Sequence, residues 1–445
     1  MTLNATGTAS YLEDTPRLEH VALVARTVSE ETGLLEDSAA STVNWTPIPM
    51  HPGDRLTFSP GSAPHRIFFY APDVDEDLSS KYCYDEESNW TTYDKARSNL
   101  VWTTDDLIAE HDGFVRVEFQ TDEYAGGFLN AYITFERTEP CLVKWPRAFA
   151  AECNRVTSRV EELREAGDCV LALIADIHHA VGDTWHDTAH NLKTCCEIVK
   201  PDAVVQLGDV TDGIAPAEVT RQLAGEVLRD LQELGAPVYG CIGNHDVNYF
   251  RGNKDLLGAA DCARLYLDRP EPSFFEDVPA SKLRLLFVHS YNHDHEERYG
   301  FSKETVKWLK RTLRRTPNDW DVLVFSHVPP LAEFHYWSDT IENSDKVIRA
   351  LERFNAHGHG RVLGYIHGHS HADQVYRTRT TFPIISVGCA KFEYFQDRKP
   401  AGSTTFMRSR DDETQDLWDF LVVKPQAGML EFVRFGAGED RSVSS

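Results

Sequence analysis

Polar side chains able to bind metal ions follow five apolar runs of this sequence. Each run is short and rich in branched apolar residues, which predicts a buried strand. The polar residues that come directly after the runs are Asp176, His178, Asp209, Asn244, His327, His369 and His371. Because the carboxyl ends of strands in an α/β sheet open onto one crevice, we expect these side chains to converge.

The donor types suit a transition-metal centre. Carboxylate oxygens, amide oxygens and imidazole nitrogens bind Zn, Mn or Fe, and no thiolate is required. A carboxylate can bridge two cations, and two metal ions can activate water and hold both oxygens of a displacement at phosphorus. Gly208, Gly243 and Gly368 precede three of the donors, as expected where a tight turn needs backbone freedom and close approach.

The order of the five clusters resembles that of the calcineurin-like metallophosphoesterases. The pattern D-x-H, GD, GNHD, H, GHxH is present here as Asp176/His178, Gly208-Asp209, 243–246, His327 and 368–371. The resemblance covers about 170–372 and implies two divalent or trivalent transition-metal ions, either Mn, Fe or Zn. It implies that one ion is held by Asp176, His178, Asp209 and His371, and the other by Asp209, Asn244, His327 and His369.

The same resemblance gives His245 and Asp246 roles outside the ligand set. His245 would contact the phosphate and protonate the leaving oxygen, and Asp246 would orient it. A histidine held by a carboxylate keeps one tautomer and gains basicity, which suits general acid–base work. The alternative for both residues is a purely structural role beside the metal ligands.

Strand and helix patterns alternate from about residue 152. Helical stripes separate the expected strands and end at Gly or Pro, and the last two runs predict a hairpin. The expected strands are 169–175, 203–207, 238–242, 283–288, 322–325, 362–366, 384–387, 418–423 and 429–435. Apolar strands between amphipathic helices predict an α/β sheet covered by helices. The resemblance implies a four-layer α/β/β/α sandwich over 152–440.

The first 140 residues show a different sequence pattern. Short apolar runs at 54–58, 66–70, 113–119 and 128–135 are separated by turn residues, which predicts an all-β sandwich domain over 1–140. Residues 141–151 are expected to be a linker. The runs are similar to β-sandwich modules of phage-tail and bacterial surface proteins, and the ending RFGAGEDR is similar to that of bacterial and phage phosphoesterases. Such a module could bind a glycan, make an assembly contact or shield the sheet.

Composition narrows the function classes. The net charge is -25 and the pI about 5.1, so a basic groove for nucleic acid is not expected. The nine cysteines are odd in number and have no tight spacing, which favours reduced, buried thiols. No signal peptide and no membrane span is predicted, so we expect a cytoplasmic location, with association with a phage virion as the alternative.

These observations predict a bacterial or phage hydrolase of a small phosphomonoester or phosphodiester. A two-metal-activated hydroxide would attack phosphorus, with His245 assisting the leaving group. The alternatives are a nuclease and a phage-tail or cell-surface binding protein with a structural metal site. Further side chains stay open as neighbours of the site or contacts to the substrate: His179, Asp212, Asn248, Tyr249, His289, His293, His295 and His335.

Overall fold

The computed structural model describes residues 147–445 apart from 180–183, 214–216, 251–253, 293–297, 335–339, 359, 393–398 and 410–411, together with short segments between 9 and 145. Every element described before residue 147 is a strand. These strands are β1 (Ala9–Glu13), β2 (Arg17–Leu18), β3 (Leu23–Val24), β4 (Arg26–Val28), β5 (Leu35–Asp37), β6 (Ser41–Asn44), β7 (Ile48–Met50), β8 (Arg55–Phe58), β9 (Arg66–Tyr70), β10 (Ser98–Val101), β11 (Leu107–Ile108), β12 (Gly113–Gln120), β13 (Ile133–Glu136) and β14 (Cys141–Trp145).

The strands before residue 147 pair antiparallel in several sheets. One sheet follows the order β10-β9-β12-β6-β3, with β7 also paired to β12, and another follows β11-β8-β13-β2. The apolar runs predicted at 54–58, 66–70 and 113–119 are β8, β9 and β12, whereas 128–132 lie outside the described residues. The expected linker at 141–151 holds β14 and the first turn of α2. The sandwich and its boundary stay predictions.

From residue 147 onward helices and strands alternate. The helices are α2 (Arg147–Leu163), α3 (Trp185–Val199), α4 (Ala217–Gln232), α5 (Ala259–Leu267), α6 (Lys303–Arg314) and α7 (Ser344–His357). The strands are β15 (Cys169–Ile174), β16 (Ala203–Gln206), β17 (Val238–Gly240), β18 (Phe274–Val278), β19 (Leu283–Phe287), β20 (Asp321–Ser326), β21 (Val362–His367), β22 (Gln374–Tyr376), β23 (Ile384–Ser386), β24 (Leu417–Lys424), β25 (Met429–Gly436) and β26 (Arg441–Ser444). The short 3₁₀ helices in this part are η3 (His245–Val247), η5 (Pro279–Ser281), η6 (Ala332–Phe334) and η7 (Glu413–Gln415).

Two six-stranded sheets carry the predicted site. The first has the order β17-β16-β15-β24-β25-β26, and the second β18-β19-β20-β21-β23-β22. Strands β15, β16 and β17 are parallel to one another, as are β19, β20, β21 and β23. The predicted closing hairpin is present, since β24 and β25 pair antiparallel along their whole length. The described fold is therefore mixed α/β, as the strand and helix patterns predict.

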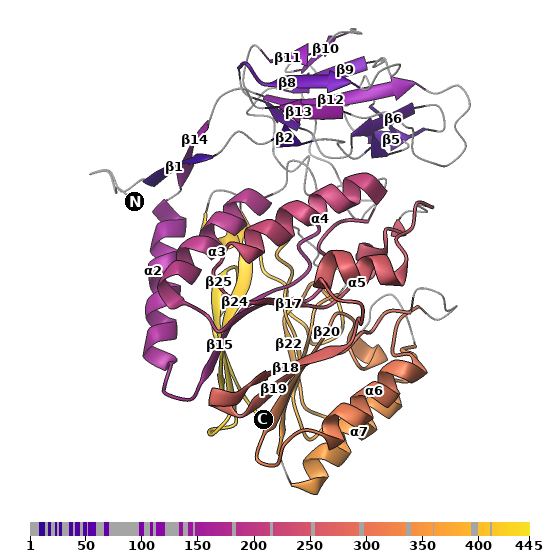
Figure 1. The fold of residues 1–445 in the computed structure, drawn as a ribbon. Coiled ribbons are helices and arrows are strands. Elements are labelled where there is room, and N and C mark those ends of the chain that lie inside the picture. The colour runs from indigo at the N-terminus through magenta and orange to yellow at the C-terminus, as the bar shows by residue number, and fades with distance from the viewer. Residues whose placement is uncertain are drawn as a thin grey trace.

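Three hydrophobic clusters hold these elements together. One joins α2–α5 to a face of the first sheet, a second joins the two sheets, and a third joins α6 and α7 to the second sheet. Figure 1 shows α2, α3 and α4 beside β15, β24 and β25, with α6 and α7 on the side of β18–β20. Every residue of β15 is buried, which explains its continuous apolar sequence.

Local sequence signals set the helix ends. Helix α6 begins after Ser302, whose hydroxyl oxygen accepts a hydrogen bond from the Thr305 backbone N–H at 3.0 Å. It buries Val306, Leu309 and Leu313, which share one helical face. Its basic residues stay on the other face, so the amphipathic pattern of this segment is that of an ordinary surface helix.

The cysteines with described side chains are free and buried, as the sequence predicts. Burial raises the pKa of the Cys169, Cys196 and Cys241 thiols, which keeps them protonated. No helix in the described part of the chain is long and apolar enough to cross a bilayer.

Candidate metal centre

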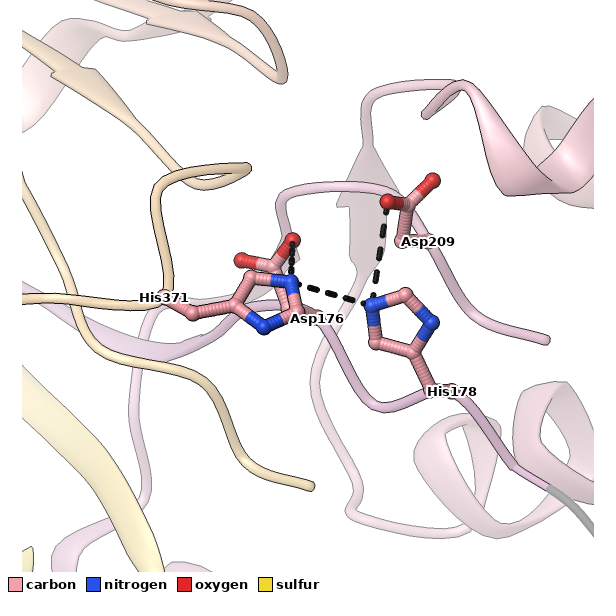
Figure 2. Close-up of side chains that lie close together, drawn as sticks. All are labelled: Asp176, His178, Asp209 and His371. Carbon is pink, nitrogen blue, oxygen red and sulfur yellow. Dashed lines mark hydrogen bonds and ion pairs between the residues drawn. The ribbon is translucent and has the colours of Figure 1, made fainter. Parts of the chain in front are cut away.

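Two aspartates and two histidines converge at the carboxyl ends of β15, β16 and β21. Figure 2 shows these four buried side chains pointing toward one another: Asp176, His178, Asp209 and His371. His178 Nε2 lies 3.1 Å from His371 Nε2 and 3.8 Å from Asp209 Oδ2. His371 Nε2 lies 3.4 Å from Asp176 Oδ1. One ligand atom from each residue lies within 4.8 Å of all the others, which is close enough for one ion.

A second donor group also contains Asp209. His327 Nε2 is 3.1 Å from Asp209 Oδ2, 3.1 Å from His369 Nδ1 and 3.0 Å from Asn244 Oδ1. His327 follows β20, and Asn244 precedes the 3₁₀ helix η3. The structure thus brings all seven predicted donors together, with Asp209 common to both groups.

The backbone at the site adopts conformations that side chains rarely favour. Positive φ angles of 47–65° occur at five of the seven donors: Asp176, His178, Asp209, His369 and His371. Such angles cost free energy for residues other than glycine and persist only where the surrounding structure enforces them. The chain therefore holds these donors against local strain.

Three glycines allow the donors to approach one another, as predicted. A Cβ at Gly243 would lie 2.1 Å from Asp209 Oδ1, and one at Gly368 would lie 2.5 Å from Asp176 Oδ2. Gly208 has a φ of +92°, and a Cβ there would lie 2.6 Å from the backbone nitrogen of Gly243. Any side chain at these positions would displace a predicted ligand or the loop beside it.

The atoms that meet at the site carry lone pairs. Lone pairs that face one another repel unless a cation lies between them. The carbonyl of Leu207 accepts a hydrogen bond from His327 Nδ1 at 2.8 Å, so the lone pair of the neutral ring is on Nε2. That lone pair meets a carboxylate oxygen and an amide oxygen. Burial lowers the pKa of His327, but the carboxylates of Asp209 and Asp176 outweigh it and raise that pKa to about 9. A field that attracts a proton so strongly also suits a bound cation, and the donor set suits Mn, Fe or Zn.

A comparison with known protein families finds a match to the segment that contains these donors. Residues 170–373 match the family model described as calcineurin-like phosphoesterase. This segment is a calcineurin-like phosphoesterase domain. The match contains every donor described above and both His245 and Asp246.

Solved structures similar to the chain include three phosphatases or related proteins. A dimetal phosphatase from Danio rerio is 16% identical over 63% of this chain and 99% of its own, with a TM-score of 0.43. The purple acid phosphatase PPD1 from yellow lupin seeds is 10% identical over 95% of this chain and 74% of its own, with a TM-score of 0.44. PhoD is 10% identical over 92% of each chain, with a TM-score of 0.38. No curated protein matches the chain.

His245 of the calcineurin-like domain lies against the first donor group. Its ring centroid is 4.6 Å from that of His178, and the two rings meet edge to face. His245 Nδ1 donates to the Asp212 carbonyl at 2.6 Å, which leaves Nε2 as its second functional nitrogen. Burial lowers the pKa of His245 to about 4, although Asp209 acts in the opposite direction.

Asp246 has a different position from the one predicted. Its carboxylate accepts hydrogen bonds from the backbone N–H groups of Asp209, Val210 and Gly243 at 3.0, 2.8 and 2.7 Å. The His245 ring is oriented instead by the Asp212 carbonyl. The physical reason is the 3₁₀ turn of η3, which places the Asp246 side chain beneath the loops that carry Asp209 and Asn244.

Asp212 and Lys391 complete the surroundings of His178. Asp212 Oδ1 lies 3.2 Å from His178 Nδ1 and 2.8 Å from the Lys391 ammonium nitrogen. Burial raises the pKa of Asp212, but Lys391 and His178 outweigh it and hold that pKa well below its usual range. The sequence left Asp212 open and did not single out Lys391, because no motif or spacing links that lysine to the site.

The other residues that the sequence left open have different surroundings in the structure. His179 points to Glu226 of α4, with Nε2 3.0 Å from the carboxylate, and so belongs to the packing beside the site. Asn248 is buried and bonds to Thr220 and Asp255. Tyr249 lies beside Asn244, as described below. His293, His295 and His335 lie outside the described residues.

Proposed function

We propose that this chain hydrolyses a small phosphomonoester or phosphodiester at a dinuclear transition-metal centre. The observation that supports this most directly is the position of Asp209, whose carboxylate belongs to two separate donor groups. A carboxylate shared in this way is the arrangement that lets one side chain bridge two cations. The match to the calcineurin-like phosphoesterase family supports the reaction class.

The donor atoms divide between two ions. Asp176, His178, Asp209 and His371 would hold one, and Asp209, Asn244, His327 and His369 would hold the other. Bound Mn, Fe or Zn would lower the pKa of a water molecule and offset the charge that develops on the phosphoryl oxygens. The protein's own contribution is a buried set of donors held in fixed positions before substrate arrives.

His245 supplies a proton to the leaving oxygen. Because the Asp212 carbonyl accepts from Nδ1, the second proton of an imidazolium must be on Nε2. With its pKa lowered by burial, the ring is neutral at pH 7 in the free protein. A bound phosphoester brings negative charge to the ring, which favours the imidazolium and raises its pKa. Nε2–H can then donate to the oxygen that leaves.

The remaining proposals concern architecture. The three hydrophobic clusters support a four-layer α/β/β/α arrangement for the calcineurin-like domain, proposed here over 152–440. Residues 1–140 are proposed to be an accessory all-β domain, in keeping with the strands found there, that makes a glycan or assembly contact.

The experiment that tests the function measures metal content and turnover together. Protein purified without chelator is analysed for metals, and then assayed with aryl phosphomonoesters and diesters before and after chelation and after adding back Mn, Fe or Zn. We expect about two ions per chain, loss of turnover on chelation and recovery on reconstitution. Asp209→Asn should lose both metal and turnover. Full turnover by metal-free protein, or two bound ions without any hydrolysis, would contradict the proposal.

A further inference from the structure

Two tyrosines, Tyr249 and Tyr299, lie beside the second donor group. Tyr249 follows Asn244 by five positions, and its hydroxyl oxygen accepts a hydrogen bond from Asn244 Nδ2 at 3.4 Å. The Tyr299 hydroxyl lies 3.3 Å from that of Tyr249, and the Tyr299 ring centroid is 5.3 Å from that of His369. Both tyrosines are partly exposed. Two phenol hydroxyls therefore meet beside the second donor group, on side chains that are partly exposed.

A third tyrosine, Tyr291, packs against both Tyr249 and Tyr299. The Tyr291 ring stacks on Tyr249 at 6.0 Å between centroids and meets Tyr299 edge to face at 5.8 Å. A β-bridge joins Tyr291 to Tyr299, and the Arg298 carbonyl accepts from the Asn292 N–H at 2.6 Å. Aromatic contacts of this kind fix ring positions, so the two hydroxyls keep their places beside Asn244.

One cationic side chain, that of Arg298, lies against these tyrosines. The Arg298 guanidinium carbon lies 5.0 Å from the Tyr249 ring centroid, and the side chain is exposed. Among the described residues no carboxylate forms an ion pair with Arg298. In a chain with a net charge of -25, an arginine that has no carboxylate partner in the described part of the chain, and that lies one tyrosine ring away from the candidate ligands, is a site for an anion.

We propose that Tyr249, Tyr299 and Arg298 form a subsite for a second anionic group of the substrate, apart from the phosphoryl group that reacts. This rests on the function proposed above and narrows its substrate class to phosphoesters that carry a further carboxylate or phosphate. One phenol hydroxyl donates to the other, and the proton of the second is left to donate to an anion beside Asn244, while the guanidinium binds the outer oxygens of that anion. Guanidinium groups bind carboxylate and phosphate through paired N–H donors, which makes Arg298 the residue that sets this preference.

The test compares two esters that differ only in charge. The phosphate esters of 4-hydroxybenzoate and 4-hydroxybenzamide have the same size, and only the first has a carboxylate. With metal-loaded wild type we expect kcat/KM to favour the benzoate ester about tenfold, mainly through KM, as for one charged hydrogen-bond partner. Arg298→Gln should remove the preference by lowering kcat/KM for the benzoate ester far more than for the benzamide ester, and Arg298→Lys should restore part of it. Arg314→Gln, on the exposed face of α6, serves as the matched control.

The outcomes separate this subsite from the proposed function. Equal kcat/KM for the two esters in the wild type, or a preference that survives Arg298→Gln, would overturn the subsite while hydrolysis itself stands. If neither ester is hydrolysed, the proposed function fails, and calorimetric binding of the two esters then decides on the subsite. Equal affinities for the charged and uncharged ester would reject it. Tyr249→Phe with Tyr299→Phe should weaken binding of the benzoate ester more than that of the benzamide ester.

Discussion

Asp212 Oδ1 lies 3.2 Å from His178 Nδ1, on the side of the ring away from His371. A carboxylate in this position fixes the tautomer of a ligating histidine and makes it a better donor. Asp212→Asn should therefore lower metal affinity about 10- to 100-fold without unfolding the chain. Metal titration against a competing chelator measures this. Asp345→Asn, which changes an exposed carboxylate on α7, should leave the affinity unchanged. Wild-type affinity in Asp212→Asn would show that the contact has no effect on the metal.

His245 should affect turnover without affecting metal content. General acid catalysis contributes roughly 10²–10⁴-fold, so His245→Ala should lose about that much in kcat and keep both ions. The loss should be smaller for esters with acidic leaving groups, which depart without a proton. His371→Ala is the contrast, because it removes a predicted ligand and should lower metal occupancy. A missing ion in His245→Ala would make His245 a ligand, and full activity on a poor leaving group would exclude the acid role.

Asp246 should affect the loops that carry Asp209 and Asn244, and should not affect transfer of a proton to the leaving oxygen. An amide in its place has only one acceptor oxygen, so Asp246→Asn leaves at least one of the N–H groups of Asp209, Val210 and Gly243 unpaired. A buried unpaired donor costs about 1–3 kcal/mol of unfolding free energy. We expect lower stability and lower metal occupancy, measured by urea titration and metal analysis. The dependence of the residual rate on the leaving group should match that of the wild type. A changed dependence would restore the role first predicted from the sequence.

Arg434 is expected to be a large determinant of stability. It is fully buried and bonds to both carboxylate oxygens of Asp373 and of Asp419. Removing one partner of such a network leaves uncompensated buried charge and costs about 3–5 kcal/mol, so Arg434→Met should lower the unfolding free energy by that amount. Arg349→Met breaks an exposed pair with Asp345 and should cost less than about 1 kcal/mol. Similar losses in the two variants would show that burial does not govern this network.

Asp416 should give stability a pH dependence that can be removed. Burial raises its pKa to about 6, although Asn191 and Thr188 donate hydrogen bonds to it. The contribution of a carboxyl with a raised folded-state pKa is fully present below the unfolded pKa of about 3.9 and is lost as pH rises through 6. The wild type should therefore lose a few kcal/mol relative to Asp416→Asn between pH 4 and pH 7. Urea titrations across this range measure the difference, and parallel curves would contradict the assignment.

The sequence predicts those features that arise from local patterns. The apolar run before Asp176 is β15, and the glycine before Asp209 has the positive φ expected of a tight turn. The seven donors could be found because each follows an apolar strand, and the carboxyl ends of such strands open onto the ligand crevice. That these strands belong to two sheets, which meet at the site, is seen only in the structure. The strand pattern predicted where polar side chains gather, and the resemblance to the calcineurin-like metallophosphoesterases supplied the division of the donors between two ions.

Contacts that depend on side-chain direction could not be predicted in the same way. Lys391 reaches Asp212 from the loop after β23, and these two residues are 179 positions apart. Asp246 is the chain neighbour of His245, which suggested that it orients that ring, yet the turn of η3 directs its carboxylate to backbone N–H groups. Sequence adjacency is a poor guide where a single 3₁₀ turn changes the direction of each side chain.

The positive φ angles at Asp176, His178, Asp209, His369 and His371 place two requirements in conflict. Glycine adopts this backbone without steric cost, and aspartate and histidine only tolerate it, whereas metal binding needs carboxylate and imidazole. Selection for thermal stability of the metal-free chain would therefore favour glycine at these positions. A thermostable variant obtained without a screen for metal binding would tend to be an inactive one, because stability and activity are in opposition at the same five residues.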